Sequence, residues 1–311
     1  MPVHPQVQTI LDLLAQMGGP KTSELSPEEA RASYRMLGAA EVAEEVERVD
    51  DRRIPGPAGD IPIRVYTPAS AVGADHGVLV WFHGGGWTIG DLETADPTCR
   101  RLANRVEAVV VSVDYRLAPE HKAPAALEDC MAALAWVVEN ASLLGVDATH
   151  VAVGGDSAGG HLAAQVSQRC RDEFGPDIDH QLLVYPVTDL TLSHPSIDEN
   201  AEGYLLTKDT MEWFVANYLG PDDDPKDPRI SPLHVEDLSE LPPATVITAE
   251  FDPLRDEGEA YATRLREAGV ATEVRRYDGM IHGFFAMATT LEDGAAAVDW
   301  AAAALKDVLA G

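Results

Sequence analysis

The segment Gly155-Asp156-Ser157-Ala158-Gly159 decides the fold of this chain. It lies between the apolar run 151–153 and the helix-like stretch 161–170, where a strand turns sharply into a helix. A serine flanked by glycines in that context fits a nucleophile elbow, which lifts the serine oxygen above the sheet. Side chains at Gly155 and Gly159 would collide with neighbouring backbone. A phosphate-binding turn is the alternative, but neither G-x-x-x-x-G-K-[ST] nor G-x-G-x-x-G occurs here.

On both sides of this segment, short apolar runs alternate with amphipathic stretches. Strands are expected at 78–82, 108–113, 151–153, 181–185 and 244–248, and helices at 96–105, 128–141, 160–173, 256–268 and 295–309. This alternation is typical of a parallel sheet that is covered on both faces. Residues 45–54 and 61–66 are expected to pair as an antiparallel edge across a turn at 55–59. The sequence therefore predicts an α/β fold.

Two stretches interrupt the alternation: residues 1–40, with helix-start signals at Ser26-Pro27-Glu28-Glu29, and residues 194–233. A parallel sheet binds ligands beyond the carboxyl ends of its strands, where a helical cap would exclude water. We therefore expect residues 1–40 and 194–233 to form a cap, and residues 41–193 and 234–311 to form the two parts of the catalytic domain.

A glycine run follows the expected strand at 78–82, in His83-Gly84-Gly85-Gly86. Glycines let backbone N–H groups approach a substrate oxygen that gains negative charge. The amides of Gly84 and Gly85, together with that of Ala158, are the expected oxyanion donors. His83 is expected to anchor this loop.

A serine needs a base, and the base needs a carboxylate to orient it. His282 follows an expected strand from Thr272 to Tyr277, so it can reach the carboxyl edge of the sheet. Asp252 follows the strand at 244–248, and the order serine, acid, histidine is that of α/β-hydrolases. Asp256 is the rival acid, although its position favours a role at the start of the following helix. His161, one turn beyond Ser157, is expected to be structural.

Together these motifs resemble the bacterial hormone-sensitive lipase family of esterases, in its Gly-Asp-Ser-Ala-Gly branch. The resemblance also includes Asp114-Tyr115-Arg116-Leu117-Ala118-Pro119-Glu120, Asp252-Pro253-Leu254-Arg255-Asp256-Glu257-Gly258 and His282-Gly283-Phe284. It implies an eight-stranded sheet under a helical cap, hydrolysis of short to medium acyl esters, and no cofactor. It also implies a homodimer through the last strand, near 272–277, because an unpaired edge invites pairing with its twofold mate.

Composition narrows the classes of partner. With 23 basic and 52 acidic side chains the net charge is −29, which would repel nucleic acid. The apolar run within the first 19 residues is interrupted by Asp12, so neither a signal peptide nor membrane insertion is expected, and the location is expected to be cytoplasmic. Three cysteines without metal-ligand spacing are expected to be buried free thiols, and no metal is expected.

Apolar residues from four segments are candidates for a substrate pocket, with ordinary packing as the alternative. They are Trp87, Tyr185, Leu206, Trp213, Phe214 and Phe284.

Two other functions stay open at this point. An amidase would use the same three catalytic groups, and plant gibberellin receptors resemble this family but lack its histidine, so the presence of His282 favours an enzyme.

Overall fold

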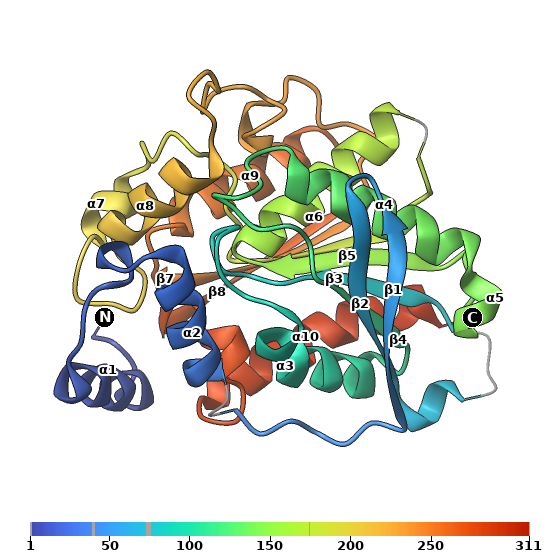
Figure 1. Cartoon of the computed structure of the whole chain (residues 1–311), viewed down its shortest axis with the longest axis horizontal. Coiled ribbons are helices and arrows are strands. Elements are labelled where there is room, and N and C mark those ends of the chain that lie inside the picture. Colours follow the sequence, from blue (N-terminus) through green and yellow to red (C-terminus); the bar gives the residue numbers. More distant parts are fainter. Residues whose placement is uncertain (1, 39–40, 73–75, 174, 311) are drawn as a thin grey trace.

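An eight-stranded sheet crosses the middle of the molecule in the order β1-β2-β4-β3-β5-β6-β7-β8 (Figure 1). The structure, a computed structural model, describes residues 2–38, 41–72, 76–173 and 175–310. The strands are β1 (Arg48–Gly56), β2 (Gly59–Thr67), β3 (Val78–Phe82), β4 (Val109–Val113), β5 (Val151–Asp156), β6 (His180–Val184), β7 (Ala244–Phe251) and β8 (Thr272–Ile281). From β4 to β8 all neighbours pair in parallel, whereas β2 pairs antiparallel with both β1 and β4. The predicted α/β fold and its antiparallel edge are confirmed.

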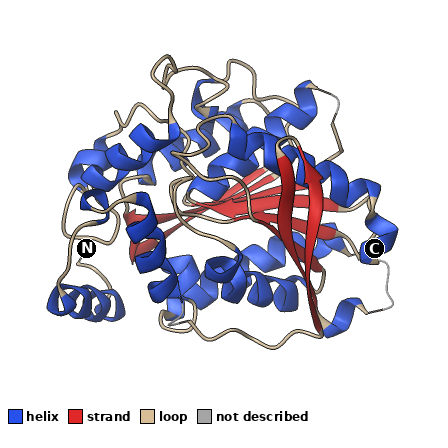
Figure 2. Ribbon diagram, in the orientation of Figure 1, coloured by secondary structure: helices blue, strands red, loops and turns tan. Residues whose placement is uncertain are grey.

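Helices cover both faces of the sheet, as Figure 2 shows. On one face lie α3 (Leu92–Val106) and α10 (Glu292–Leu309), and on the other α4 (Ala125–Glu139), α6 (Ala158–Asp172) and α9 (Arg255–Glu267). A short α5 (Ala141–Leu144) follows α4. Strands β3 and β4 are buried along their whole length, which explains their uninterrupted apolar sequences.

Several strands are longer than the sequence indicated, and the extensions of β5 and β8 concern function. β5 continues to Asp156, so Ser157 is the first residue after it. β8 continues past Tyr277 to Ile281, so His282 directly follows the strand. Because these strands are parallel, their carboxyl ends bring both residues to the same edge of the sheet.

Four helices from the two expected cap segments gather at this edge (Figure 1). They are α1 (Pro5–Met17), α2 (Pro27–Gly38), α7 (Pro195–Glu199) and α8 (Lys208–Tyr218). The start signal of α2 is confirmed, because the Glu29 amide donates to Ser26 Oγ and the Ser26 amide donates to Glu29 Oε2. The expected cap boundary at residue 40 lies outside the described residues.

The two ends of the expected cap insertion meet beside the sheet. The Leu190 amide donates to Ser231 Oγ at 2.8 Å, and the Leu233 amide donates to the Thr188 carbonyl at 3.0 Å. The buried carboxylate of Asp189 adds contacts with Nε2 of His194, at 3.3 Å, and of His234, at 3.0 Å. The insertion therefore leaves and rejoins the sheet at one place.

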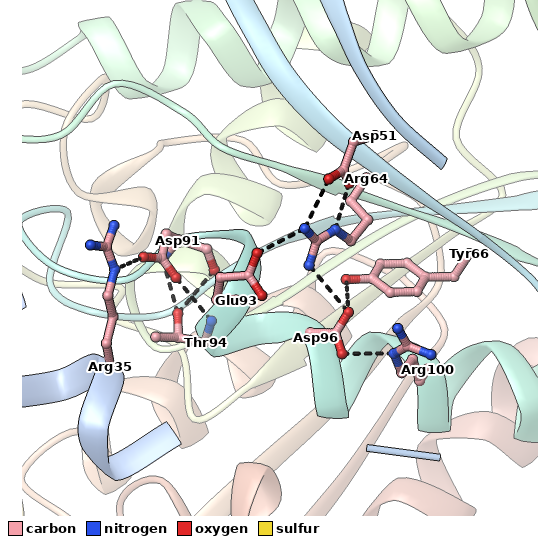
Figure 3. A network of polar contacts seen from close by, with 9 residues as sticks. All are labelled: Arg35, Asp51, Arg64, Tyr66, Asp91, Glu93, Thr94, Asp96 and Arg100. Carbon is pink, nitrogen blue, oxygen red and sulfur yellow. Dashed lines mark hydrogen bonds and ion pairs between the residues drawn. The ribbon is translucent and has the colours of Figure 1, made fainter. Parts of the chain in front are cut away.

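A polar network joins the edge strands to α3 (Figure 3). Arg64 of β2, whose side chain is 12% exposed, pairs with Asp51, Glu93 and Asp96. The Tyr66 hydroxyl also donates to Asp96. The network holds the antiparallel edge against the helix layer.

Within the described residues, Cys99, Cys130 and Cys170 are buried free thiols, as expected. Across the same part of the chain, none of the helices combines the length and apolar character needed to cross a bilayer.

Candidate active site

Ser157 occupies a strained turn between β5 and α6. Its φ of 56° lies in a region that non-glycine residues rarely adopt. The Ser157 amide donates to the Val184 carbonyl at 2.8 Å, which ties the turn to β6. A β-carbon at Gly159 would overlap the carbonyl oxygen of Phe82, so the predicted need for glycine there is confirmed. The N-terminus of α6 lies directly under the serine, where it favours negative charge.

The structure brings the three expected side chains together. His282 Nε2 lies 3.0 Å from Ser157 Oγ, and His282 Nδ1 lies 2.8 Å from Asp252 Oδ2. Asp252 is fully buried directly after β7, and its other carboxylate oxygen accepts the Leu254 amide at 2.9 Å. This arrangement orients the imidazole so that its second nitrogen can take the serine proton.

Asp256, the rival acid, lies elsewhere. It stands in the first turn of α9, where its carboxylate pairs with Arg255 and accepts the Ser196 amide at 2.8 Å. It therefore connects α9 to α7.

The glycine loop differs from expectation at Gly84. The Gly84 amide donates to Asp156 Oδ1 at 2.9 Å, so it is already engaged and cannot also serve a substrate oxygen in this arrangement. Burial raises the pKa of the Asp156 carboxyl. Within the described part of the chain, the amides of Gly85, Gly86 and Ala158 have no hydrogen-bond acceptor, so these N–H groups are available to a substrate oxygen. The choice of donors depends on the contact between Gly84 and Asp156, which the glycine run alone does not reveal.

His83 anchors this loop, as expected. Its ring stacks on Tyr115 with centroids 4.3 Å apart, and the Tyr115 hydroxyl donates to the His83 carbonyl at 2.7 Å. The contact fixes the start of the loop to the segment after β4.

The six candidate pocket residues have different surroundings. Trp87, Tyr185 and Phe284 are at most 1% exposed, Leu206 and Phe214 are buried, and Trp213 is half-buried. Phe284 packs on Tyr185 and Tyr277, which is core packing. Tyr185 lies against the His282 ring, with centroids 4.5 Å apart, and the Phe214 ring occupies the space that a side chain at Gly86 would need. Tyr185 and Phe214 thus border the candidate site.

Among the described residues, no metal centre accompanies this site. In the described ranges, His, Cys, Asp and Glu side chains form no cluster of three that could hold a metal ion. A cavity of about 430 Å³ is lined by residues around Arg48, Thr67 and Leu144, none of which belongs to the site.

One residue of helix α2 contacts the segment that follows the glycine run, without any signal in the sequence. Arg31 of α2 donates from Nε to the Thr88 carbonyl at 2.8 Å and from Nη2 to the Ala118 carbonyl at 2.9 Å. It also forms an ion pair with Glu120. An arginine in an amphipathic helix is normally read as solvated, so only the fold could reveal this contact.

Comparisons with known proteins agree with this fold. Residues 79–286 match a sequence family described by the α/β-hydrolase fold. Carboxylesterase NlhH of Mycobacterium tuberculosis is 45% identical over 289 residues, which cover 91% of this chain and 89% of that protein. Carboxylic ester hydrolase LipN of the same organism is 51% identical over 242 residues, covering 76% of this chain but only 64% of LipN. The solved hyperthermophilic esterase of the archaeon Pyrobaculum calidifontis is 44% identical, with a TM-score of 0.94 and 99% of both chains covered.

Proposed function

The chain belongs to the hormone-sensitive-lipase-like family (family IV) of α/β-hydrolase carboxylesterases. From that premise we propose that Ser157, His282 and Asp252 catalyse the hydrolysis of short to medium acyl esters. The observation that carries this proposal is the continuous contact from Ser157 Oγ through His282 to Asp252.

In the first half of the proposed cycle, Ser157 Oγ attacks the ester carbonyl while His282 Nε2 takes the serine proton. Buried Asp252 stabilises the imidazolium that forms. The tetrahedral oxyanion accepts hydrogen bonds from the amides of Gly85, Gly86 and Ala158, and the imidazolium then protonates the departing alcohol. Gly86 replaces Gly84 in this set because the Gly84 amide is engaged by Asp156.

In the second half, water attacks the acyl-serine ester. His282 removes a proton from this water, the same amides hold the second oxyanion, and the carboxylic acid leaves as Ser157 regains its proton. Every step uses groups that lie at the carboxyl edge of the sheet.

The test is hydrolysis of p-nitrophenyl esters from acetate to laurate, with matching anilides as amide substrates. Ser157→Ala should lose nearly all activity, on the order of a million-fold in kcat, as loss of a serine nucleophile does elsewhere. Asp252→Asn should lose about 10,000-fold, as expected for the wrong imidazole tautomer, whereas Asp256→Asn should retain activity. Wild-type activity in Ser157→Ala, or faster turnover of anilides than of esters, would overturn the proposal.

We also propose that the segments expected at 1–40 and 194–233 act as a cap over the site, since α1, α2, α7 and α8 lie at the edge that carries Ser157 and His282. A homodimer through β8 is proposed because, among the described strands, β8 pairs only with β7 and forms an edge of the sheet. A monomeric mass by light scattering would refute the dimer.

Cytoplasmic residence stays a prediction, which fractionation of the source cells would test.

A further inference from the structure

Trp87 follows Gly86 in the glycine loop and has an unusual backbone conformation. Its φ is 57°, although it is not a glycine, and its side chain is completely buried. Such a conformation costs free energy and persists only where the surroundings over-determine it. The contacts of the indole therefore bear directly on the conformation of the loop.

His161 supplies the first of these contacts. The Trp87 indole N–H donates to His161 Nδ1 at 3.1 Å, and the opposite ring nitrogen, Nε2, lies 2.7 Å from the Ile230 carbonyl. A carbonyl only accepts, so Nε2 carries the proton and Nδ1 is left as the acceptor that the indole needs. Burial lowers the pKa of His161 to about 4, so the ring stays neutral near pH 7.

Tyr218, the last residue of cap helix α8, supplies the second contact. Its ring stacks on the Trp87 indole with centroids 4.2 Å apart and 14° between the planes. The end of α8 is itself fixed, because the Ala123 amide donates to the Tyr218 carbonyl at 2.9 Å. The indole is thus held between the helix that follows Ser157 and a helix of the cap.

We propose that His161 and Tyr218 are positioning residues, which hold Trp87 and thereby keep the Gly85 and Gly86 amides aimed at the substrate oxyanion. This inference rests on the proposed function. Oxyanion donors act only within about 2.7–3.1 Å of the developing charge, so a small shift of the loop would weaken them. Cap helix α8 would then be part of the catalytic apparatus as well as a cover.

The first test removes the acceptor at position 161. In His161→Leu, kcat for p-nitrophenyl butyrate should fall by about 10-fold to 100-fold. This loss should not exceed the loss in kcat that complete removal of one oxyanion donor causes. KM should change little, and affinity for a trifluoromethyl ketone, which mimics the tetrahedral intermediate, should fall by the same factor as kcat. In His161→Asn, the amide oxygen can accept near the position of Nδ1 and should restore most of the activity.

The second test asks whether the effect passes through the indole. Trp87→Phe keeps an aromatic ring for Tyr218 but lacks the N–H, so it should lose about as much kcat as His161→Leu. The double variant should lose no more than either single variant, since both remove the same hydrogen bond. If His161→Leu does not fold, Trp87→Phe and His161→Asn still carry the test.

His180 offers a matched control. It is also buried, with its pKa lowered to about 4, and its Nε2 lies 2.9 Å from Thr245 Oγ1. It stands at the start of β6, away from the glycine loop. His180→Leu should lower the melting temperature but leave kcat and inhibitor affinity unchanged.

Two results would overturn the inference. One is a His161→Leu variant that, like His180→Leu, loses only thermal stability. The other is a double variant whose loss equals the product of the two single losses. Both leave the proposed function standing as long as Ser157→Ala is inactive, whereas an active Ser157→Ala would refute the proposed function itself.

Discussion

Gly86 is a single residue whose missing side chain shapes the site. Its φ is 53°, and a β-carbon there would overlap the buried ring of Phe214. In Gly86→Ala, the loop or the ring must move, and one oxyanion donor moves with it. We expect kcat to fall by about 100-fold or more on p-nitrophenyl esters.

Gly269 provides the comparison for this prediction. It has a φ of 85°, and a β-carbon there would meet no described atom within 4 Å. Gly269→Ala should cost about 1 kcal/mol of stability through backbone strain alone. Equal kcat values in the two variants would contradict the role given to Gly86.

Glu257 predicts a pH dependence of stability. This carboxyl is fully buried, its Oε1 accepts the Thr188 and Asp189 amides, and its Oε2 has no partner in the described structure. Burial raises its pKa well above the usual value. The folded chain therefore binds this proton more tightly than the unfolded chain, so the contribution of Glu257 to stability falls as pH rises above about 4.3.

Glu257→Gln cannot ionise, so it removes this pH dependence. The melting temperature of the variant minus that of the wild type should increase from pH 5 to pH 8. If the difference in melting temperature between Glu257→Gln and the wild type stays constant from pH 5 to pH 8, the Glu257 carboxyl has the same protonation in the folded and unfolded chain, which contradicts the prediction.

For single residues, the sequence motifs predicted those that are expected to act through their side chains. Ser157, Asp252 and His282 are recognisable because their types and their places after strands are both visible in the sequence. The oxyanion donors are backbone groups, and their direction depends on φ and ψ, so the choice between Gly84 and Gly86 could not be read from three identical residues. The engagement of Gly84 by Asp156 depends on a contact across 72 positions of sequence.

The end of helix α8 illustrates how one side chain can hold an element. Lys122 Nζ donates to the carbonyls of Ala216, Asn217 and Leu219, at 2.6 to 3.0 Å. These carbonyls belong to the last turn of the helix and to its C-cap residue Leu219, where a cation is favoured. Lys122→Met should cost about 1–2 kcal/mol, because the charge is lost but the group is half-exposed.

Limited proteolysis and thermal unfolding together check this prediction. Cleavage within 220–228, the connector after α8, should become faster in Lys122→Met. Lys226→Met, which changes an exposed lysine in that connector, should behave as the wild type. Unchanged cleavage and melting in Lys122→Met would mean that the cap is held by its apolar contacts alone.

At the scale of helices and strands, the hydrophobic periodicity of the sequence predicted the type of each element better than its length. The sequence predicted every strand from β1 to β8, yet β8 extends four residues beyond Tyr277. The extension contains Gly279 and Asp278, residues disfavoured in strands, and pairing of Ile281 with Phe251 outweighs that preference. The short helix α5 had no separate signal because its sequence continues the apolar pattern of α4.

The net charge of −29 acts on the whole molecule. Repulsion among so many carboxylates destabilises the compact state, and salt weakens that repulsion because the screening length falls from about 30 Å at 0.01 M to about 3 Å at 1 M. Salt also weakens ion pairs such as those of Arg64 with Asp51 and Glu93 (Figure 3). The two carboxylates are 62% and 69% exposed, and pairs with such exposed partners contribute little to stability. The melting temperature should therefore rise between 0.01 M and 1 M NaCl.

The same salt series at pH 5, where carboxylates begin to protonate, should give a smaller rise. A fall in melting temperature with salt at pH 7 would mean that local ion pairs outweigh the long-range repulsion. Charge composition alone predicted the repulsion, but the shielding of Arg64 depends on packing between β2 and α3 that no local pattern encodes.

The proposed cap insertion departs from and returns to the sheet through neighbouring residues, Leu190 beside Ser231 and Thr188 beside Leu233. A segment with such closely spaced ends is suited to exchange between related enzymes, because a replacement of different length can be grafted without displacing β6 or β7. The graft has one constraint: any new segment must again present aromatic rings where Phe214 and Tyr218 meet the glycine loop. Substrate range could then diversify through the insertion, while the residues that perform the reaction stay the same.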